Sequence, residues 1–219
     1  MVLFCQRIPP WLTGISNNTF FALLYVSEIK QINHDEETFM KTTIFLFHPD
    51  LKNSTVNHAL AQAAKEAGFE VRDLYSLYPN EEIDVKAEQA ALEGTDRIVL
   101  QFPMYWYSCP PLLKKWEDLV LEHGWAYGST GTALQGKELL IAVSPGAPAG
   151  NYHHDGQNYP VTDLLRPFQA TSNLIGTKYL QPFITVGATY LTGSDLDKQA
   201  QKYAACLQEE SIPLLGAYE

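Results

Sequence analysis

The stretch that decides the fold is Gln101-Phe102-Pro103-Met104-Tyr105-Trp106-Tyr107-Ser108-Cys109-Pro110-Pro111. It follows residues 97–100, in which three apolar residues after Arg97 are typical of a buried strand, and precedes residues 112–121, where a proline in the first turn favours a helix. In an open α/β sheet, ligands bind at the carboxyl ends of the central strands. An aromatic loop at such a strand end can stack on a flat ring and offer backbone hydrogen bonds. The stretch therefore predicts a ligand site.

Strand and helix signals alternate on both sides of this stretch. Strands are expected at residues 42–47, 69–74, 97–102, 138–143 and 181–186. Helices are expected between Ser54 and Gly68, between Asp84 and Gly94, at residues 111–121, from residue 162 or 163 to Gly176, and from a capping box at Ser194 through Leu207. Five strands that alternate with five helices predict an α/β fold, in which a parallel sheet carries helices on both faces.

Length and composition narrow the class of protein. The 219 residues suffice for one globular domain with a single core. The net charge of −10 argues against nucleic acid and against an anionic membrane surface as partners. Three scattered cysteines support neither a disulfide framework nor a zinc site, so we expect a reducing compartment, the cytoplasm.

The first 39 residues differ from the rest. They show no sustained helical period, and their apolar run at residues 20–26 is too short to span a bilayer, which needs about 20 residues. No small-residue cleavage site follows this run, which argues against a secretory signal. We therefore expect residues 1–39 to be an N-terminal extension of unclear role and residues 40–219 to form the domain.

Two further strand ends carry features of a ligand site. The first loop (residues 48–57) leads into a helix, whose free N–H groups and dipole favour a phosphate. Ser54 and Thr55 add hydroxyl donors there, and Asn57 can brace the loop. No P-loop lysine is present, so NTP hydrolysis is not expected. A plain helix cap is the alternative interpretation.

The third loop (residues 144–147) has the sequence Ser-Pro-Gly-Ala, in which Gly146 lets the backbone approach a ligand closely. With the second loop (residues 103–107), the three loops together predict a flavin site. Tyr152 and His154 follow the third loop, and a tyrosine and a histidine there can stabilise charge that develops on the ring. A solvated loop is the alternative for the histidines. Adjacent histidines point apart, so a metal site is not expected.

Several motifs in the same order resemble the flavodoxin-like NAD(P)H:quinone oxidoreductases, especially the bacterial branch with the ancillary oxidoreductases of potassium efflux systems. The resemblance covers residues 40–210. Its motifs are His48-Pro49 with Ser54 and Asn57, Asp73-Leu74-Tyr75 with Leu77-Tyr78-Pro79, Ile83-Asp84 with Ala87-Glu88-Gln89, Phe102 to Tyr107 with Pro110 to Lys114, and His123 to Gly128.

The resemblance implies a five-stranded parallel sheet of order 2-1-3-4-5, a bound flavin, NAD(P)H as co-substrate, and a homodimer with substrate at the subunit boundary. FMN is favoured over FAD by the bacterial branch. The implied cofactor-binding residues are His48, Ser54, Thr55, Val56, Asn57, Pro103, Met104, Tyr105, Trp106, Tyr107, Ser144, Pro145, Gly146 and Ala147. The implied substrate-binding residues are Trp106, Tyr127 and Tyr152, and the candidate catalytic residues are Tyr152 and His154.

Two positions depart from the family's pattern. Tyr105 stands where the family commonly has glutamine, so a side-chain amide contact to the flavin is missing. Residues 144–147 are Ser-Pro-Gly-Ala where the family often has Thr-Thr-Gly-Gly, and Pro145 has no N–H to donate to the ring. The expected activity is hydride transfer from NAD(P)H through FMN to a quinone. The alternatives are a regulatory subunit that binds a membrane potassium efflux system, and a one-electron flavodoxin-type carrier.

Overall fold

A single parallel sheet forms the centre of the protein. The computed structural model describes residues 40–153 and 159–216, so the predictions for residues 1–39 and for His154 lie outside the described residues. The strands are β1 (Thr42–Leu46), β2 (Glu70–Asp73), β3 (Arg97–Pro103), β4 (Glu138–Ser144), β5 (Lys178–Tyr179) and β6 (Phe183–Ile184). Their order is β2-β1-β3-β4-β5, and β6 also pairs with β4. This confirms the predicted order 2-1-3-4-5.

The predicted strand at residues 181–186 is wrong in its bounds. Two short strands, β5 and β6, pair in parallel with successive parts of β4. Pro182 lies between them and has no N–H to continue the ladder. Gln181 instead donates its backbone N–H to Pro213 O at 2.8 Å, outside the parallel ladder.

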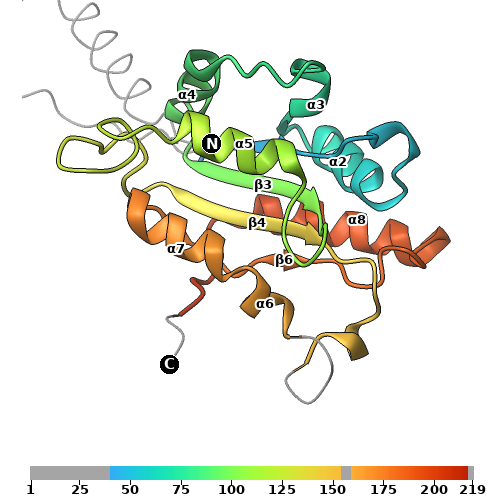
Figure 1. The fold of residues 1–219 in the computed structure, drawn as a ribbon. Helices are drawn as coiled ribbons and strands as arrows, with labels where there is room; N and C mark the ends of the chain where they lie inside the picture. Colours follow the sequence, from blue (N-terminus) through green and yellow to red (C-terminus); the bar gives the residue numbers. More distant parts are fainter. Residues whose placement is uncertain (1–39, 154–158, 217–219) are drawn as a thin grey trace, which may run out of the picture. The chain divides into compact units, whose positions relative to one another are not determined.

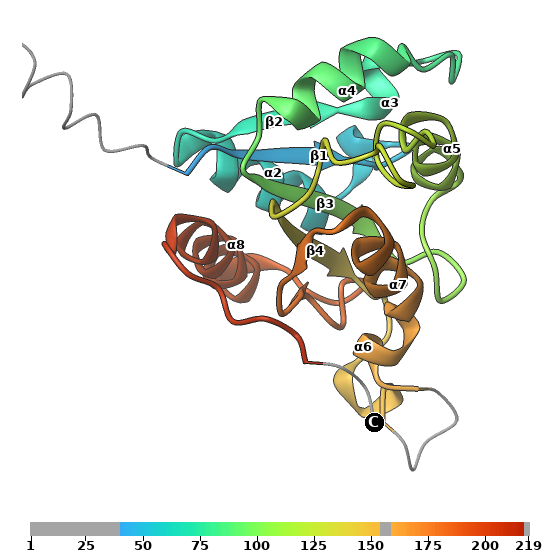
Figure 2. The same cartoon turned by 90° about the vertical axis from the view of Figure 1, so that its left-hand side faces the viewer.

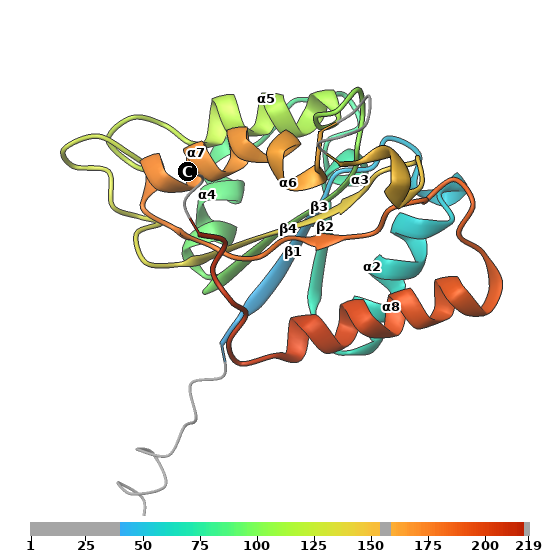
Figure 3. The ribbon, with the colours of Figure 1, turned by 90° about the horizontal axis from the view of Figure 1, so that it is seen from below.

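Helices cover both faces of the sheet, as the alternating pattern predicts (Figure 3). One face carries α2 (Val56–Glu66) and α8 (Gly193–Gln208). The other face carries α4 (Val85–Glu93), α5 (Pro111–Val120) and α7 (Arg166–Ile175). Figure 2 shows the two layers from the side. The short segments are η2 (Leu51–Asn53), α3 (Leu74–Leu77), η3 (Ala149–Asn151) and α6 (Val161–Leu164).

The central strands are apolar on both faces because both faces are covered. Side chains alternate along each strand, with period two. Phe45, Leu100 and Ile141 pack toward α4, α5 and α7. Ile44 and Val99 pack toward α2 and α8. The core therefore consists of two apolar layers separated by the sheet.

Local capping explains some helix ends. Asp84 accepts a hydrogen bond from the Ala87 N–H at 3.0 Å, and Gly176 ends α7 in the left-handed region with φ of 74°. The predicted capping box at Ser194 is wrong, because the N-cap of α8 is Thr192, two residues earlier, and the helix begins at Gly193. The helix expected from residue 162 or 163 begins at Val161 and is divided into α6 and α7.

Candidate functional site

The three predicted loops meet at the carboxyl ends of β1, β3 and β4, which are neighbours in the sheet. The backbone N–H of Met104 in the second loop donates to Ser144 O in the third at 3.2 Å. Asn57 Nδ2 in the first loop donates to Ser144 Oγ at 2.8 Å. Pro103 also pairs with Ser144 in the ladder. Figure 1 shows the second loop leaving the end of β3 and entering α5. The fold therefore brings the loops into contact.

The first loop presents the amino end of α2. Ser54 Oγ accepts a hydrogen bond from the Asn57 N–H at 3.2 Å. The backbone N–H groups of Thr55 and Val56 have no acceptor among the described residues, and no acidic residue lies in the first turn of α2. Free N–H groups at the positive end of a helix dipole attract an anion. This end of the site therefore suits a phosphate.

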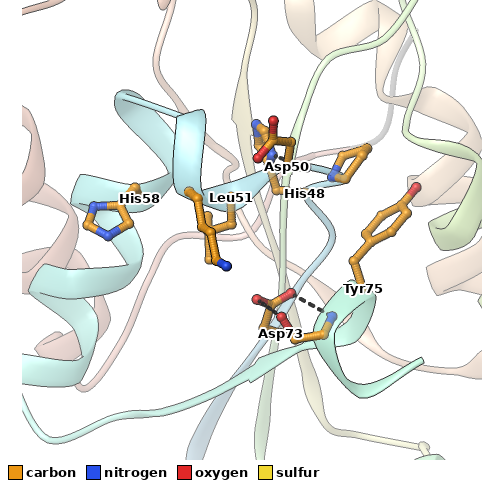
Figure 4. A pocket seen from close by; sticks show the side chains of 9 residues that line it. His48, Asp50, Leu51, His58, Asp73 and Tyr75 are labelled. Carbon is orange, nitrogen blue, oxygen red and sulfur yellow. Dashed lines mark hydrogen bonds between the residues drawn. The ribbon is translucent and has the colours of Figure 1, made fainter. Parts of the chain in front are cut away.

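His48 lies beside a cavity of about 550 Å³ on the β2 side of the first loop (Figure 4). Its Nδ1 accepts a hydrogen bond from the Asp50 N–H at 3.1 Å, so the ring proton belongs on Nε2. Burial lowers the pKa of His48, against the opposite effect of the nearby Asp50 and Asp73 carboxylates. The imidazole is therefore neutral at pH 7 and acts as a donor. The cavity is lined by His48, Pro49, Asp50, Leu51, Lys52, His58, Asp73, Tyr75 and Ser76.

The second loop is a tight turn with an unusual backbone. Tyr105 and Ser108 exchange backbone hydrogen bonds of 3.2 and 2.9 Å, and the two residues between them have φ of 48° at Trp106 and 62° at Tyr107. A left-handed conformation costs a bulky residue about 1–2 kcal/mol. Trp106 is 94% exposed, and neither N–H has an acceptor among the described residues. Strain of this kind gathers at functional sites.

The third loop is fixed through its carbonyl groups. Its residues Pro145, Gly146 and Ala147 accept hydrogen bonds from the backbone N–H groups of 188, 189 and 187, at 3.0, 3.4 and 2.8 Å. A Cβ at Gly146 would lie 2.9 Å from Thr189 Oγ1, so this approach requires glycine. Within the third loop, the backbone N–H of Gly146 has no acceptor among the described residues.

Tyr152 connects the second and third loops. Burial raises the pKa of its hydroxyl, a hydrogen bond from the Ala147 N–H lowers it, and the proximity of Tyr107 raises it further. The phenol is therefore protonated at pH 7 and has an O–H to donate.

Tyr127 lies in a groove that also contains Ser108, the residue that closes the turn of the second loop. The groove has a volume of about 330 Å³ between α5 and α7, and His123 contacts the Tyr127 ring edge-on with the ring centres 5.4 Å apart. The groove also contains Glu117, whose pKa is raised to about 7 by burial.

The sequence prediction missed two residues below the loops. Gln101 and Tyr203 are fully buried and connect to Asn57. Asn57 itself is 2% exposed, and its side chain braces the loops from below. A signal for Gln101 was visible, since a single amide interrupts the apolar run of β3. No local pattern marks Tyr203, which occupies an ordinary core position of α8.

The exposed backbone suits one kind of ligand. It offers N–H donors at three places: the amino end of α2, the turn at Trp106 and Tyr107, and Gly146. Such donors match a phosphate at one end and an aromatic ring rich in hydrogen-bond acceptors at the other. The residues present therefore fit a flavin mononucleotide.

Comparison with known proteins gives close relatives. "General stress protein 14" of Bacillus subtilis is 52% identical over 175 residues, which is 79% of this chain and 100% of that protein. "Uncharacterized NAD(P)H oxidoreductase YrkL" of the same species is 47% identical over 78% of this chain and 99% of that protein. "Glutathione-regulated potassium-efflux system ancillary protein KefF" of Klebsiella aerogenes is 46% identical over 73% of this chain and 90% of that protein.

Solved structures agree with these relatives. General stress protein 14 of Treponema denticola, solved in complex with FMN, is 43% identical and superimposes with a TM-score of 0.72 over 76% of this chain and 97% of that one. An NADPH-quinone reductase of P. pentosaceus is 31% identical, with a TM-score of 0.67 over 75% and 96% of the two chains. The family description "Flavodoxin-like fold" matches residues 40–209. This chain therefore belongs to the flavodoxin-like fold family.

Proposed function

We propose that this protein is an FMN-dependent oxidoreductase that passes hydride from NAD(P)H to a quinone. The observation that carries the proposal is the set of free N–H groups at three neighbouring strand ends. The names of the relatives support it, since one is an NAD(P)H oxidoreductase, one is a quinone reductase, and one contains FMN. Within the ranges that the structure describes, no helix is long and apolar enough to cross a membrane. We propose a cytoplasmic location because the three scattered cysteines support no disulfide framework.

The residues divide the binding of FMN between them. The N–H groups of Thr55 and Val56 bind the phosphate, while Ser54 and Asn57 fix the loop that carries them. His48, neutral, donates from Nε2. The backbone of the second and third loops holds the ring, and Met104 and Ser144 keep these loops together. Tyr105 has no side-chain amide, and Pro145 has no backbone N–H, so neither of these two groups donates to the ring.

The bound flavin supplies the two-electron chemistry, and the protein supplies orientation and electrostatics. The Tyr152 O–H donates toward negative charge that develops on the ring, because its raised pKa keeps it protonated. His154 is proposed as a second donor. The exposed ring of Trp106 stacks against the nicotinamide or the quinone. Tyr127 of a second subunit closes the pocket.

We also propose a homodimer. Leu174 on α7 is an exposed apolar residue of the groove that contains Tyr127, Leu119 on α5 is also exposed, and Trp106 is exposed at the second loop. Exposed apolar patches often mark interfaces between proteins. Sedimentation of the purified protein is expected to give twice the mass of one chain. Sedimentation as a monomer in the presence of FMN would reject the dimer.

The central test is cofactor content and turnover. The purified protein, reconstituted with FMN, is expected to be yellow and to oxidise NAD(P)H with a soluble quinone by ping-pong kinetics. Failure to bind FMN or FAD would reject the proposal. Ping-pong turnover with NAD(P)H alone as reductant also excludes a one-electron carrier, which needs a separate reductase.

A second candidate function is regulation of a potassium efflux system. It is favoured by a relative whose name assigns it as an ancillary protein of such a system, 46% identical to this chain. Co-expression with the efflux protein and measurement of potassium release would test this role. A flavin-binding protein that turns over quinone but leaves potassium release unchanged would reject it.

A further inference from the structure

A chain of buried hydrogen bonds runs beneath the three loops. Tyr203 OH on α8 donates to Gln101 Oε1 on β3 at 3.2 Å. Gln101 Nε2 donates to the backbone oxygen of Asn57 at 3.0 Å and to its Oδ1 at 3.4 Å. Asn57 Nδ2 on α2 donates to Ser144 Oγ at the end of β4, at 2.8 Å. The chain thus joins both helices of one face to the two central strands.

All four side chains are buried. Tyr203 and Gln101 have no exposed surface, and Asn57 and Ser144 are 2% and 4% exposed. A buried polar group without a partner costs free energy, so each member has to be satisfied by its neighbour. In a low-dielectric interior such a chain is also cooperative, because each bond polarises the next.

The hydrogen bonds of the chain have one direction. An amide nitrogen only donates, so Asn57 Nδ2 obliges Ser144 Oγ to accept. The Ser144 hydroxyl hydrogen then needs a different acceptor, and none is found among the described residues. The bond that Oγ accepts from Asn57 Nδ2 also restricts where the Ser144 hydroxyl hydrogen can point. Ser144 is the last residue of β4, where the third loop begins.

We propose that Tyr203 and Gln101 are positioning residues, which act through Asn57 to hold the Ser144 hydroxyl as a hydrogen-bond donor to bound FMN. This inference rests on the proposed function, because FMN is the acceptor. It extends the site to α8, whose residue Tyr203 is 102 positions from Gln101 in the sequence. Tyr203 lies on α8 and bonds to Gln101 on β3, so its effect on FMN is expected to pass through the hydrogen bonds of Gln101 and Asn57.

The test is a double-mutant cycle on FMN affinity, measured by fluorescence titration of the full chain. Ser144→Ala removes the donor and is expected to raise the FMN Kd about three- to tenfold. Tyr203→Phe removes the first bond and is expected to raise it about two- to fivefold. In the double variant the Kd should equal that of Ser144→Ala alone, because Tyr203 acts through Ser144.

Thr95→Val is the matched control. Thr95 Oγ1 is a buried hydroxyl that contacts Thr43 Oγ1 at 2.9 Å, before the amino end of β3. Its loss should destabilise the fold and leave the FMN Kd unchanged. Should Tyr203→Phe fail to fold, Gln101→Met removes the middle hydrogen bonds of the series and replaces it in the same double-mutant cycle.

The outcomes separate this inference from the proposed function. A wild-type protein that binds no FMN overturns the proposed function and the role of the chain together. A wild-type protein that binds FMN, with an unchanged Kd in Tyr203→Phe, overturns the positioning role alone. Effects of Tyr203→Phe and Ser144→Ala that multiply in the double variant also overturn it, because independent structural effects are additive in free energy.

Discussion

The strands of the sheet have two ends, called here the amino edge and the carboxyl edge, and the two differ in how completely their polar groups are hydrogen-bonded. At the amino edge, Arg97 Nε pairs with Glu138 at 2.7 Å, and its Nη1 donates to the backbone oxygens of Leu207 and Glu209 at 3.2 and 2.9 Å. Lys137 Nζ donates to the backbone oxygens of residues 93 and 95. At the carboxyl edge, backbone N–H groups are free and Trp106 is strained and exposed.

This contrast teaches that stability and function are separated along the strands. The amino edge, or bonded edge, holds the end of α8 against the sheet. The carboxyl edge, or open edge, keeps hydrogen-bond donors available to a ligand. A donor that bonds within the protein is not available for binding, so a ligand site costs stability that other parts of the fold provide. Changes at one edge should therefore leave the property of the other edge intact.

The largest expected effect is at the bonded edge. Arg97→Met leaves Glu138 without its partner and several carbonyls without a donor, so the free energy of unfolding is expected to fall by about 3–5 kcal/mol. Urea unfolding measures it. Lys41→Met is the control, since its 3.9 Å pair with Glu70 is exposed and worth less than about 1 kcal/mol. Equal losses in the two variants would contradict the contrast.

Tyr152→Phe tests the open edge. Loss of the O–H donor is expected to slow flavin reduction by NAD(P)H roughly ten- to a thousandfold, while the free energy of unfolding and the FMN Kd change little. Stopped-flow absorbance measures the reduction. An unchanged rate in a fully flavinated variant would show that Tyr152 only packs in its loop, and His154→Ala would then be measured.

Glu117 lies on α5, between the two edges, and makes the free energy of unfolding depend on pH. Burial raises its pKa from 4.5 to about 7, so the folded state binds this proton more tightly than the unfolded chain. Stability is therefore lost as the pH rises from 4.5 to about 7. Glu117→Gln is expected to add about 1–3 kcal/mol at pH 8 and almost nothing at pH 4. An equal gain at both pH values would reject this linkage.

Trp106→Gly should show the opposite trade at the open edge. Glycine tolerates positive φ, so the free energy of unfolding is expected to rise by about 1 kcal/mol, while turnover with quinone falls because the stacking ring is lost. Glu81→Gly is the control, because Glu81 also has positive φ, at 57°, but lies outside the three loops. It should gain stability without losing activity. Parallel activity losses in both variants would contradict a role for Trp106.

The smallest effect is expected from deletion of residues 1–39. We propose that residues 40–219 form the functional domain, and the family match at residues 40–209 supports this division. FMN affinity and turnover should stay as in the full chain. Loss of flavin from the shortened protein would show that the segment contributes to the fold or to the dimer.

The sequence predicts the central part of the fold well for a physical reason. Strands β1, β3 and β4 are buried on both faces, so their apolar runs stand out in the sequence. The strands beyond β4 were harder to predict, because Pro182 divides a run of residues that looks like one strand. The bond from Tyr203 to Gln101 spans 102 residues and has no local pattern. Periodicity reports which face a side chain takes, and it does not report which distant residue it meets.

The third loop also has a consequence for protein engineering. Its shape is held by three backbone hydrogen bonds that its own carbonyls accept from residues 187–189. Proline is compatible with this arrangement at position 145, because the residue only accepts a hydrogen bond through its carbonyl and donates none. Pro145 is buried and a Cβ at Gly146 would meet Thr189, whereas Ala147 is only partly buried. A library varied at Ala147 would change the side chains beside the ring while the carbonyl bonds keep the loop in place.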